Sequence, residues 1–208
     1  MSLFVKLCGI KTESDLEAAV AAGADAVGFV LTPSPRQISS AQAARLKRLL
    51  PDQVLGVAVF HQPSTELLRR TEEEVGPDLF QAEAGTLVGL APDKLLPVVV
   101  DGEDMARRLE QAAGATSRGW ALVDSAARGV TARPPIWARL AQLTTAAKMI
   151  LAGGLNEENV AEVVSSVRPF GVDVSSGIES SPGVKDPERM RSFVAGARSA
   201  LPLAGGQG

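Results

Sequence analysis

Residues 149–177 read MILAGGLNEENVAEVVSSVRPFGVDVSSG, and this stretch decides the fold. It contains two short apolar runs, Met149–Ala152 and Val172–Val174, and each is followed by a glycine-containing turn. Between them, Asn156 precedes a longer segment that starts with two glutamates, which is typical of a helix start. Continuous apolar runs of this length indicate parallel strands that are buried on both faces. The stretch therefore predicts two parallel strands joined by a helix.

The same alternation of short apolar runs and amphipathic segments extends over the whole chain. Eight runs are expected to be strands: Phe4–Cys8, Ala26–Val30, Leu55–Phe60, Asp78–Gln81, Leu96–Val100, Trp120–Val123, Met149–Ala152 and Val172–Val174. Eight such units without a break in composition predict an α/β fold, a single-domain (β/α)8 TIM barrel. An open doubly wound sheet is the alternative, but it usually needs fewer strands, and no G-x-G-x-x-G motif follows the first run. We expect the barrel to span residues 1–203 and residues 204–208 to form a flexible tail.

Capping residues mark the starts of several expected helices. Thr12 precedes a first turn with acidic residues, and Ser39 with Gln42 has the spacing of a capping box. Asp186 stands before a proline, which combines a capping side chain with proline at the first helical position. The weakest unit follows the fourth run, around Gly85–Pro92, where a full helix does not fit.

Composition and charge exclude several classes of function. The formal charge is −3 and the basic residues are scattered among acidic ones, which argues against a nucleic-acid partner. No apolar stretch approaches the length of a membrane span, so no membrane partner is expected. A single cysteine excludes an intrachain disulfide and favours a reducing, cytoplasmic location. With only one histidine besides, a Cys/His zinc site is also excluded. Oligomeric state is not indicated, and a monomer is the default expectation.

Polar residues at the ends of the expected strands are the first candidates for chemistry, because parallel barrels carry their active sites there. Alternation along the first run points Lys6 and Cys8 into the barrel, and the same argument applies to Asp124 and Asp173. Strands one and eight are neighbours in a closed barrel, so Lys6 and Asp173 can pair. Lys6 could also favour the thiolate form of Cys8. The plainer alternatives are a small buried hydrophobic residue for Cys8 and a helix cap or turn residue for Asp124.

Two glycine-containing turns follow the seventh and eighth runs. The first contains Gly153 and Gly154, and the second contains Ser175, Ser176 and Gly177. Barrels of this kind hold phosphate groups here, on backbone N–H groups and a helix N-terminus. Glycine lets the backbone approach an anion closely, and serine hydroxyls can donate hydrogen bonds. The two turns together predict a phosphate site.

The segment after the second run presents one arginine on a stiff loop. It reads TPSPR at residues 32–36, so that two prolines precede Arg36. The functional interpretation is a guanidinium group positioned to clamp a planar carboxylate. The plainer alternative is an ordinary surface turn.

Taken together, these stretches resemble phosphoribosylanthranilate isomerase of tryptophan biosynthesis. The matching segments are KLCGI at 6–10, GFV at 28–30, SPR at 34–36, VDS at 123–125, LAGGLN at 151–156, GVDVSSGIE at 171–179 and PGVKD at 182–186. They keep the order of the family and span almost the whole chain. Each segment alone is unspecific, but jointly they are highly specific.

The resemblance implies an Amadori rearrangement, in which an N-linked phosphoribosyl anthranilate opens its ring and becomes an aminoketose. In the family, a cysteine at the position of Cys8 is the general base and an aspartate at the position of Asp124 is the general acid. An arginine at the position of Arg36 binds the anthranilate carboxylate, and an aspartate at the position of Asp173 lies near the substrate. The two glycine-containing turns would hold the phosphate. The expected partner is thus a small phosphorylated substrate, and no cofactor or metal is implied.

Two segments depart from the family pattern. Where the family has Gln-Leu-His-Gly after strand four, this chain reads FQAEAG at 80–85, with Glu83 in place of the histidine. The loop after strand six, GVTARPPIW at 129–137, lacks two family glycines. Two alternatives follow. One is another phosphate-binding barrel enzyme, such as a bifunctional isomerase that also serves histidine biosynthesis, although histidine-pathway barrels use an aspartate in place of Cys8. The other is a barrel that binds a phosphorylated ligand without catalysing a reaction.

Overall fold

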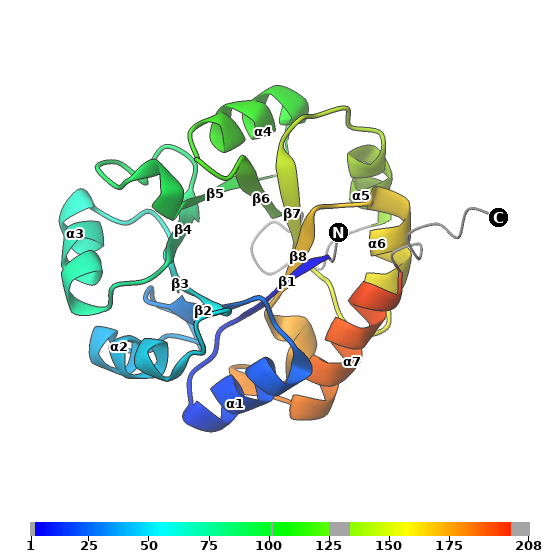
Figure 1. Cartoon of the computed structure of the whole chain (residues 1–208). Helices are drawn as coiled ribbons and strands as arrows, with labels where there is room; N and C mark the ends of the chain where they lie inside the picture. Colours follow the sequence, from blue (N-terminus) through cyan, green and yellow to red (C-terminus); the bar gives the residue numbers. More distant parts are fainter. Residues whose placement is uncertain (1–2, 101, 125–133, 201–208) are drawn as a thin grey trace.

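The chain folds into a closed barrel of eight parallel strands with helices around the outside (Figure 1). The structure is a computed structural model that describes residues 3–100, 102–124 and 134–200. The strands are β1 Phe4–Cys8, β2 Ala26–Val30, β3 Leu55–Val59, β4 Leu79–Glu83, β5 Leu95–Val100, β6 Trp120–Asp124, β7 Lys148–Ala152 and β8 Gly171–Val174. Each pairs with its neighbour in sequence, and β1 closes the ring on β8. The predicted single-domain (β/α)8 TIM barrel is confirmed, and the alternative of an open sheet is wrong.

The strands coincide with the predicted apolar runs to within two residues at either end. The largest difference is at β4, which continues past Gln81 to Glu83. β6 likewise includes Asp124, one residue beyond the predicted end. An apolar run locates the buried part of a strand, but the ladder of hydrogen bonds continues through polar residues at the open end of the barrel.

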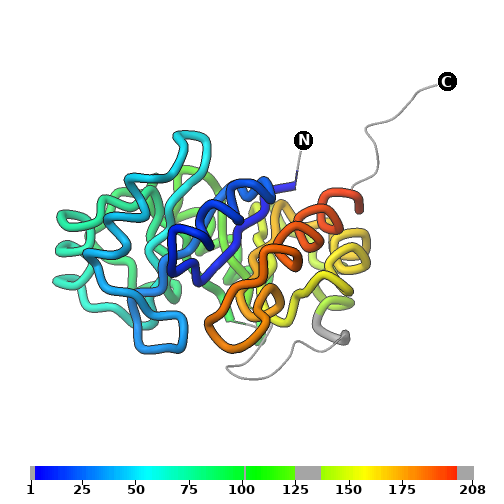
Figure 2. The backbone as a smooth tube through the Cα atoms, turned by 90° about the horizontal axis from the view of Figure 1, so that it is seen from below, coloured from blue at the N-terminus to red at the C-terminus, as the bar shows by residue number. Residues whose placement is uncertain are grey.

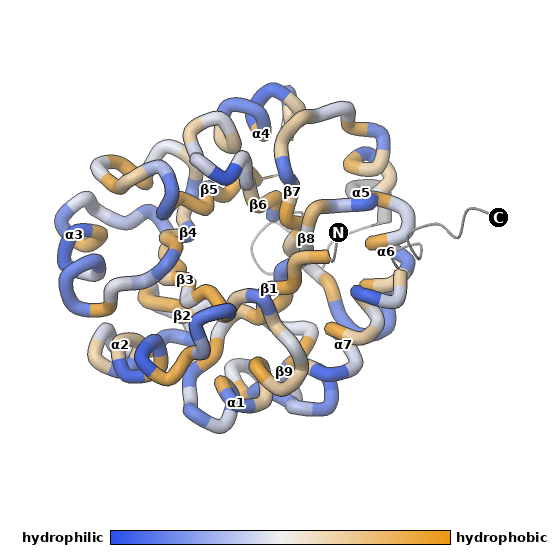
Figure 3. Tube along the Cα trace, viewed as in Figure 1, coloured by the Kyte–Doolittle hydropathy of each residue, from blue (hydrophilic) through white to orange (hydrophobic). Residues whose placement is uncertain are grey.

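Alternation along the strands separates the barrel interior from the surface that packs against the helices. The interior core consists of Phe4, Ala26, Val57, Leu79, Leu96, Trp120, Leu122, Ile150 and Ala152. The opposite strand faces, including Val5 and Leu7, join the helices in a larger core. Figure 3 shows the result as an apolar ring of strands inside a layer of helices with hydrophilic residues. Inward-facing polar residues near the carboxyl ends of the strands therefore line the mouth of the barrel.

The described residues form seven α-helices, and three of their predicted caps are present. The helices are α1 Glu13–Ala22, α2 Ser40–Leu49, α3 Thr65–Glu74, α4 Met105–Gly114, α5 Pro134–Ala141, α6 Val160–Val167 and α7 Pro187–Ser199. Thr12 and Asp15 form a reciprocal capping box at α1, and Asp186 caps α7. Ser39 caps α2 by accepting from the N–H of Gln42. The Gln42 side chain instead donates to the carbonyl of Lys11, so this box is only half formed.

The predicted helix start at Asn156 is wrong. The α6 helix begins at Val160, and Asn156 accepts hydrogen bonds from the N–H groups of Glu158 and Asn159. Its side chain thus stabilises a turn ahead of the helix rather than the helix itself. An asparagine can do either, because its short amide side chain bonds to backbone two or three residues on.

The connection between β4 and β5 contains no α-helix, as the sequence predicts. It holds one short 3-10 helix, η1 Pro92–Lys94. The predicted tail at 204–208 and the altered loop at 129–133 lie outside the described residues. No helix in the described ranges is long and apolar enough to cross a membrane.

The last βα unit closes against the first. The α7 helix packs beside α1 (Figure 2). Ahead of α7, the chain forms a 3-10 turn, η2 Ser176–Ile178, and a small hairpin of β9 Glu179–Ser181 and β10 Val184–Lys185. Figure 2 shows this hairpin and the segment after β2 at the same end of the barrel. That end is the mouth, where the candidate residues lie.

Candidate active site

Lys6 and Asp173 form an ion pair inside the barrel. Their Cα atoms are register partners on β1 and β8, and Lys6 Nζ lies 2.7 Å from Asp173 Oδ1. Lys6 is fully buried and Asp173 nearly so. Burial alone would lower the pKa of Lys6, but the attraction of Asp173 and the proximity of Cys8 outweigh it, so the pKa is raised. Lys6 therefore stays charged at neutral pH, and the predicted pairing is confirmed.

Cys8 ends β1 and is buried on the inward face at the mouth. Burial raises the pKa of its thiol, and the nearby Asp173 carboxylate adds to this effect. Lys6 and Lys185 act in the opposite direction but do not overcome burial. Lys6 thus favours the thiolate, as predicted, but burial outweighs it and the net pKa of Cys8 is raised. The charge of Lys6 is largely neutralised by Asp173, and the thiol is held in its neutral form.

Glycines beside Cys8 make room for the site. A Cβ atom at Gly28, the register partner of Cys8 on β2, would lie 2.7 Å from its sulfur. A Cβ atom at Gly9 would lie 2.9 Å from Arg36 Cδ. Gly9 also has a backbone φ of +80°, which residues other than glycine rarely adopt. The absence of side chains at these two positions lets Cys8 and Arg36 lie close together.

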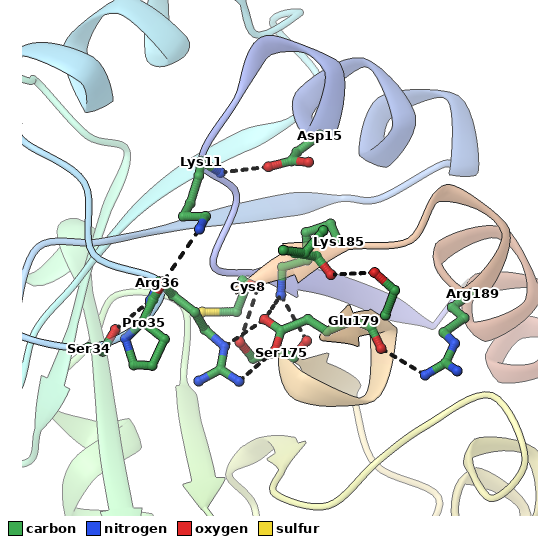
Figure 4. A network of polar contacts seen from close by, with 12 residues as sticks. Cys8, Lys11, Asp15, Ser34, Pro35, Arg36, Ser175, Glu179, Lys185 and Arg189 are labelled. Atoms are coloured by element: carbon green, nitrogen blue, oxygen red, sulfur yellow. Dashed lines mark hydrogen bonds and ion pairs between the residues drawn. The ribbon is translucent and has the colours of Figure 1, made fainter. Parts of the chain in front are cut away.

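Arg36 is held by a carboxylate of the chain itself. Its Nε donates to Glu179 Oε1 at 2.7 Å and its Nη2 donates to Oε2 at 2.8 Å (Figure 4). Such a bidentate pair fixes the plane of the guanidinium group. Within the described residues, Nη1 and the second hydrogen of Nη2 have no partner and can donate to a second carboxylate. The predicted surface turn is thus part of the mouth, and Glu179 is a residue that sequence reasoning missed.

Lys185 is a second missed residue. It is buried, and its Nζ donates to Glu179 Oε1 and to the Ser175 carbonyl, each at 2.8 Å. Burial would raise the pKa of Glu179, but Arg36 and Lys185 outweigh it, so the pKa is lowered. Burial lowers the pKa of Lys185, and Glu179 opposes this only in part. Figure 4 shows this network next to Cys8.

The two predicted phosphate turns are packed against each other. A Cβ atom on Gly177 would lie 1.9 Å from the Leu155 carbonyl oxygen, so only glycine permits this contact. Gly153 and Gly154 both have positive φ, at +94° and +69°. Ser175 Oγ donates to the Cys8 carbonyl at 3.2 Å, which ties the end of β8 to the end of β1. The turns are thus brought together beside Cys8, while Ser176 is exposed.

Asp124 ends β6 on the inward face and is partly exposed. Its register partners are Val100 on β5 and Ala152 on β7. Two strands, β7 and β8, separate β6 from β1 around the ring. Asp124 and Cys8 therefore approach the mouth from different sides, with the phosphate turns between them.

Glu83, the departure after β4, pairs with the only histidine of the chain. His61, two residues beyond the end of β3, contacts Glu83 Oε1 through its Nδ1 atom. Glu83 Oε2 accepts from the Gln62 N–H at 2.8 Å. Burial would raise the pKa of Glu83, but this backbone N–H and His61 outweigh it and lower the pKa. His61 is the third residue that sequence reasoning missed.

Two further features of the described residues lie apart from this site or add nothing to it. Within the described ranges, no group of three or more His, Cys, Asp and Glu residues could hold a metal ion. A cavity of about 380 Å³ lies on the outer side of the barrel, between the β4–β5 connection and α4. Its lining includes Leu87, Pro97 and Arg108 but none of the candidate residues. The candidate chemistry is confined to the mouth.

Comparison with known proteins gives a consistent result. The family model "N-(5'phosphoribosyl)anthranilate (PRA) isomerase" matches residues 5–196. An N-(5'-phosphoribosyl)anthranilate isomerase from Streptococcus pneumoniae (strain Hungary19A-6) is 37% identical over 194 residues, covering 91% of this chain and 93% of its own. Among solved structures, phosphoribosyl anthranilate isomerase from Thermotoga maritima has a TM-score of 0.79 at 31% identity, covering 95% of this chain and 99% of its own.

A further solved structure of a phosphoribosyl anthranilate isomerase contains a ligand. It is a complex with reduced 1-(o-carboxyphenylamino)-1-deoxyribulose 5-phosphate, and it has a TM-score of 0.75 at 31% identity. It covers 95% of this chain and 99% of its own. The similarity thus extends over the whole barrel rather than a single motif.

Proposed function

Because the chain belongs to the N-(5'-phosphoribosyl)anthranilate isomerase family, we propose that Cys8 is the general base of its reaction and Asp124 the general acid. The enzyme isomerises N-(5'-phosphoribosyl)anthranilate in tryptophan biosynthesis, an aldose–ketose conversion of the Amadori type. One observation carries the assignment of the two residues. Each ends a strand on an inward-facing position, and the two glycine-containing turns lie between them at the mouth.

The reaction needs one acid and one base on the same sugar. Asp124 gives a proton to the ring oxygen while the bond from C1 to that oxygen breaks and the nitrogen lone pair forms a C=N bond. The thiolate of Cys8 then removes the proton from C2. The C–H electrons form a C1=C2 bond, and the C=N electrons return to nitrogen. The enol then loses its hydroxyl proton while the C1=C2 electrons take up a proton at C1, which gives the C2 ketone of the aminoketose.

The protonation states set a cost that the site must offset. The reactive form needs a protonated aspartate and an ionised cysteine at once. With ordinary pKa values of about 3.9 and 8.5, this form is only ~10⁻⁴·⁶ of the population, a handicap of roughly 6 kcal/mol. Burial raises the pKa of Cys8 and adds to the handicap. We infer that Lys6 and Lys185 act chiefly when the thiolate forms, because both lower the pKa of Cys8.

The charges around the mouth support binding of an anionic substrate. Beside Cys8, the ion-pair network has three cations, Lys6, Arg36 and Lys185, and two carboxylates, Asp173 and Glu179. The packed turns at Gly153–Gly154 and Ser175–Gly177 would receive the phosphate on backbone N–H groups. Arg36, already oriented by Glu179, would donate to the anthranilate carboxylate with little further loss of side-chain freedom. Asp173 would lie near the sugar.

An apolar wall would receive the aromatic ring. Val98 is the register partner of Glu83, and Val100 is the register partner of Asp124. Both point to the inward side of β5, and Val100 is 43% exposed. The ligand of the related complex has both a carboxyphenyl group and a phosphate. A substrate of this shape would place its ring on β5 and its phosphate on β7 and β8.

The thiol also bears on where the enzyme works. We propose the cytoplasm, because a catalytic cysteine must stay reduced and reducing compartments keep it so. A small phosphorylated molecule is the partner that this site favours.

Turnover of N-(5'-phosphoribosyl)anthranilate, followed through the loss of anthranilate-type fluorescence, tests the assignment. Cys8→Ala and Asp124→Asn should each lower kcat by at least ~10²-fold, the low end for general acid–base catalysis. Circular dichroism would verify that both variants remain folded. A Cys8→Ala enzyme with near-normal kcat would show that another group is the base.

A further inference from the structure

His61 and Glu83 form a pair on the side of the mouth opposite the phosphate turns. Glu83 ends β4 on the inward face, and His61 follows β3, the neighbouring strand. By alternation His61 shares the inward side of Val59, whereas Phe60 between them packs outward against Phe80. In the closed ring β4 lies diametrically across from β8. The pair therefore faces the far end of any ligand whose phosphate is bound after β7 and β8.

The contacts of the pair fix the orientation of the imidazole ring. Glu83 Oε1 contacts Nδ1 of His61, and Glu83 Oε2 is held by the Gln62 N–H. A carboxylate that is anchored at one oxygen and bound to Nδ1 at the other sets both the tautomer and the plane of the ring. In the part of the chain that the structure describes, Nε2 of His61 has no partner. The His61 side chain is 36% exposed.

A buried amide beneath the pair also lacks a partner. Gln81 precedes Glu83 by two residues and shares its inward face, and it is 8% exposed. Its Oε1 atom is buried and finds no donor among the described residues. A buried polar atom without a partner is costly in an ordinary structural position. Gln81 Oε1 and His61 Nε2 thus both lack a partner where β3 and β4 end, which indicates that a ligand completes their hydrogen bonding.

We propose that His61, held by Glu83, is a positioning residue that donates from Nε2 to the carboxylate of the anthranilate group. This inference rests on the proposed function, because it assumes that the phosphate binds after β7 and β8. Arg36, which follows β2 and is held by Glu179, is a second donor at the mouth, so the carboxylate would lie between its guanidinium group and the imidazole of His61. Gln81 would accept from the substrate below. The sequence carries glutamate where the family has histidine, and here an imidazole reaches the same corner from the neighbouring strand.

Steady-state kinetics test the role directly. His61→Ala should raise KM about tenfold or more, because it removes a hydrogen bond to a charged group, and should change kcat little. His61→Gln, whose amide can still donate, should recover part of this loss. Glu83→Gln should fall between the wild type and His61→Ala. The control is Glu73→Gln, which removes an exposed ion pair with Arg69 on α3 and should leave KM unchanged.

Inhibition by two ligands separates this role from a merely structural one. His61→Ala should weaken inhibition by reduced 1-(o-carboxyphenylamino)-1-deoxyribulose 5-phosphate, which has the carboxylate, and leave inhibition by inorganic phosphate unchanged. A His61→Ala enzyme with wild-type KM and wild-type inhibition by both ligands would overturn the inference. If His61→Ala gives that result while Cys8→Ala abolishes turnover, this inference fails and the proposed function stands.

Nuclear magnetic resonance of the imidazole gives an independent test that needs no variant. The chain has one histidine, so its ring signals report on His61 alone. Reduced 1-(o-carboxyphenylamino)-1-deoxyribulose 5-phosphate should shift these signals. Inorganic phosphate, which has no carboxylate, should not. Identical signals with and without saturating analogue would rule out the contact.

Discussion

Lys6 and Asp173 join the first and last strands of the barrel through an ion pair with 2.7 Å between Nζ and Oδ1. Lys6 precedes Cys8 by two residues on the same strand. Lys6 lowers the pKa of the Cys8 thiol, and Asp173 raises it. The pair therefore joins the two strands and leaves Cys8, the proposed base, beside a nearly neutral pair instead of a free ammonium group. The pair's stability and its effect on the thiol can be measured separately.

The first prediction concerns stability. Lys6→Met should cost about 3–5 kcal/mol of unfolding free energy, because it leaves the Asp173 carboxylate buried without a partner. Asp173→Leu should also lower the unfolding free energy, because it leaves the Lys6 ammonium group buried without a partner. The double variant should recover most of the loss, because a buried ion pair and a packed apolar pair differ little in stability. Urea unfolding of all four proteins gives the coupling energy. Additive losses in the double variant would contradict a direct pairing.

The second prediction concerns the thiol. Alkylation of the single cysteine should follow a titration with a midpoint above the ordinary value of about 8.5, because burial raises the pKa of Cys8. Lys185→Met should move the midpoint higher still, since Lys185 lowers this pKa. Lys148→Met, at the opposite end of the barrel, serves as the control. Rates of iodoacetamide reaction against pH decide it. A midpoint at or below about 8.5 would mean that the two lysines outweigh burial.

Much of this site could be predicted from alternation along the strands. Lys6 and Asp173 stand on strands whose other residues are apolar, so their direction follows from period two alone. Glu179 and Lys185 could not be found in this way, because they lie in the hairpin after β8, where no periodicity assigns a direction. His61 was missed for a related reason. It lies beyond its strand, and its partner Glu83 comes from the next strand, so that neither segment alone indicates a pair.

The third prediction concerns acid stability. Arg36 and Lys185 lower the pKa of Glu179, so its folded value lies below the ordinary value of about 4.3. A depressed carboxylate contributes stability that is present above the unfolded pKa and is lost as pH falls through the folded pKa. Glu179→Gln should therefore be less stable than the wild type at pH 7, and the difference should shrink below about pH 4. Thermal unfolding over pH 3–7 measures this. A gap that stays constant with pH would assign the loss to packing instead.

The last prediction concerns the contact between the two turns. Gly177→Ala places a Cβ atom where the Leu155 carbonyl oxygen lies 1.9 Å away, so the two turns must separate. If the phosphate is held by backbone N–H groups of both turns, their separation breaks charge-assisted hydrogen bonds. We expect KM to rise at least about tenfold, since each such bond is worth about 1.5–3 kcal/mol. Inhibition by inorganic phosphate should weaken in parallel, because the lost contacts involve the phosphate and not the ring. Gly114→Ala on α4, where an added Cβ meets nothing within 4 Å, is the matched control and should leave both values unchanged. A Gly177→Ala enzyme with a lower kcat, an unchanged KM and unchanged inhibition by phosphate would show that the phosphate does not bind at these turns.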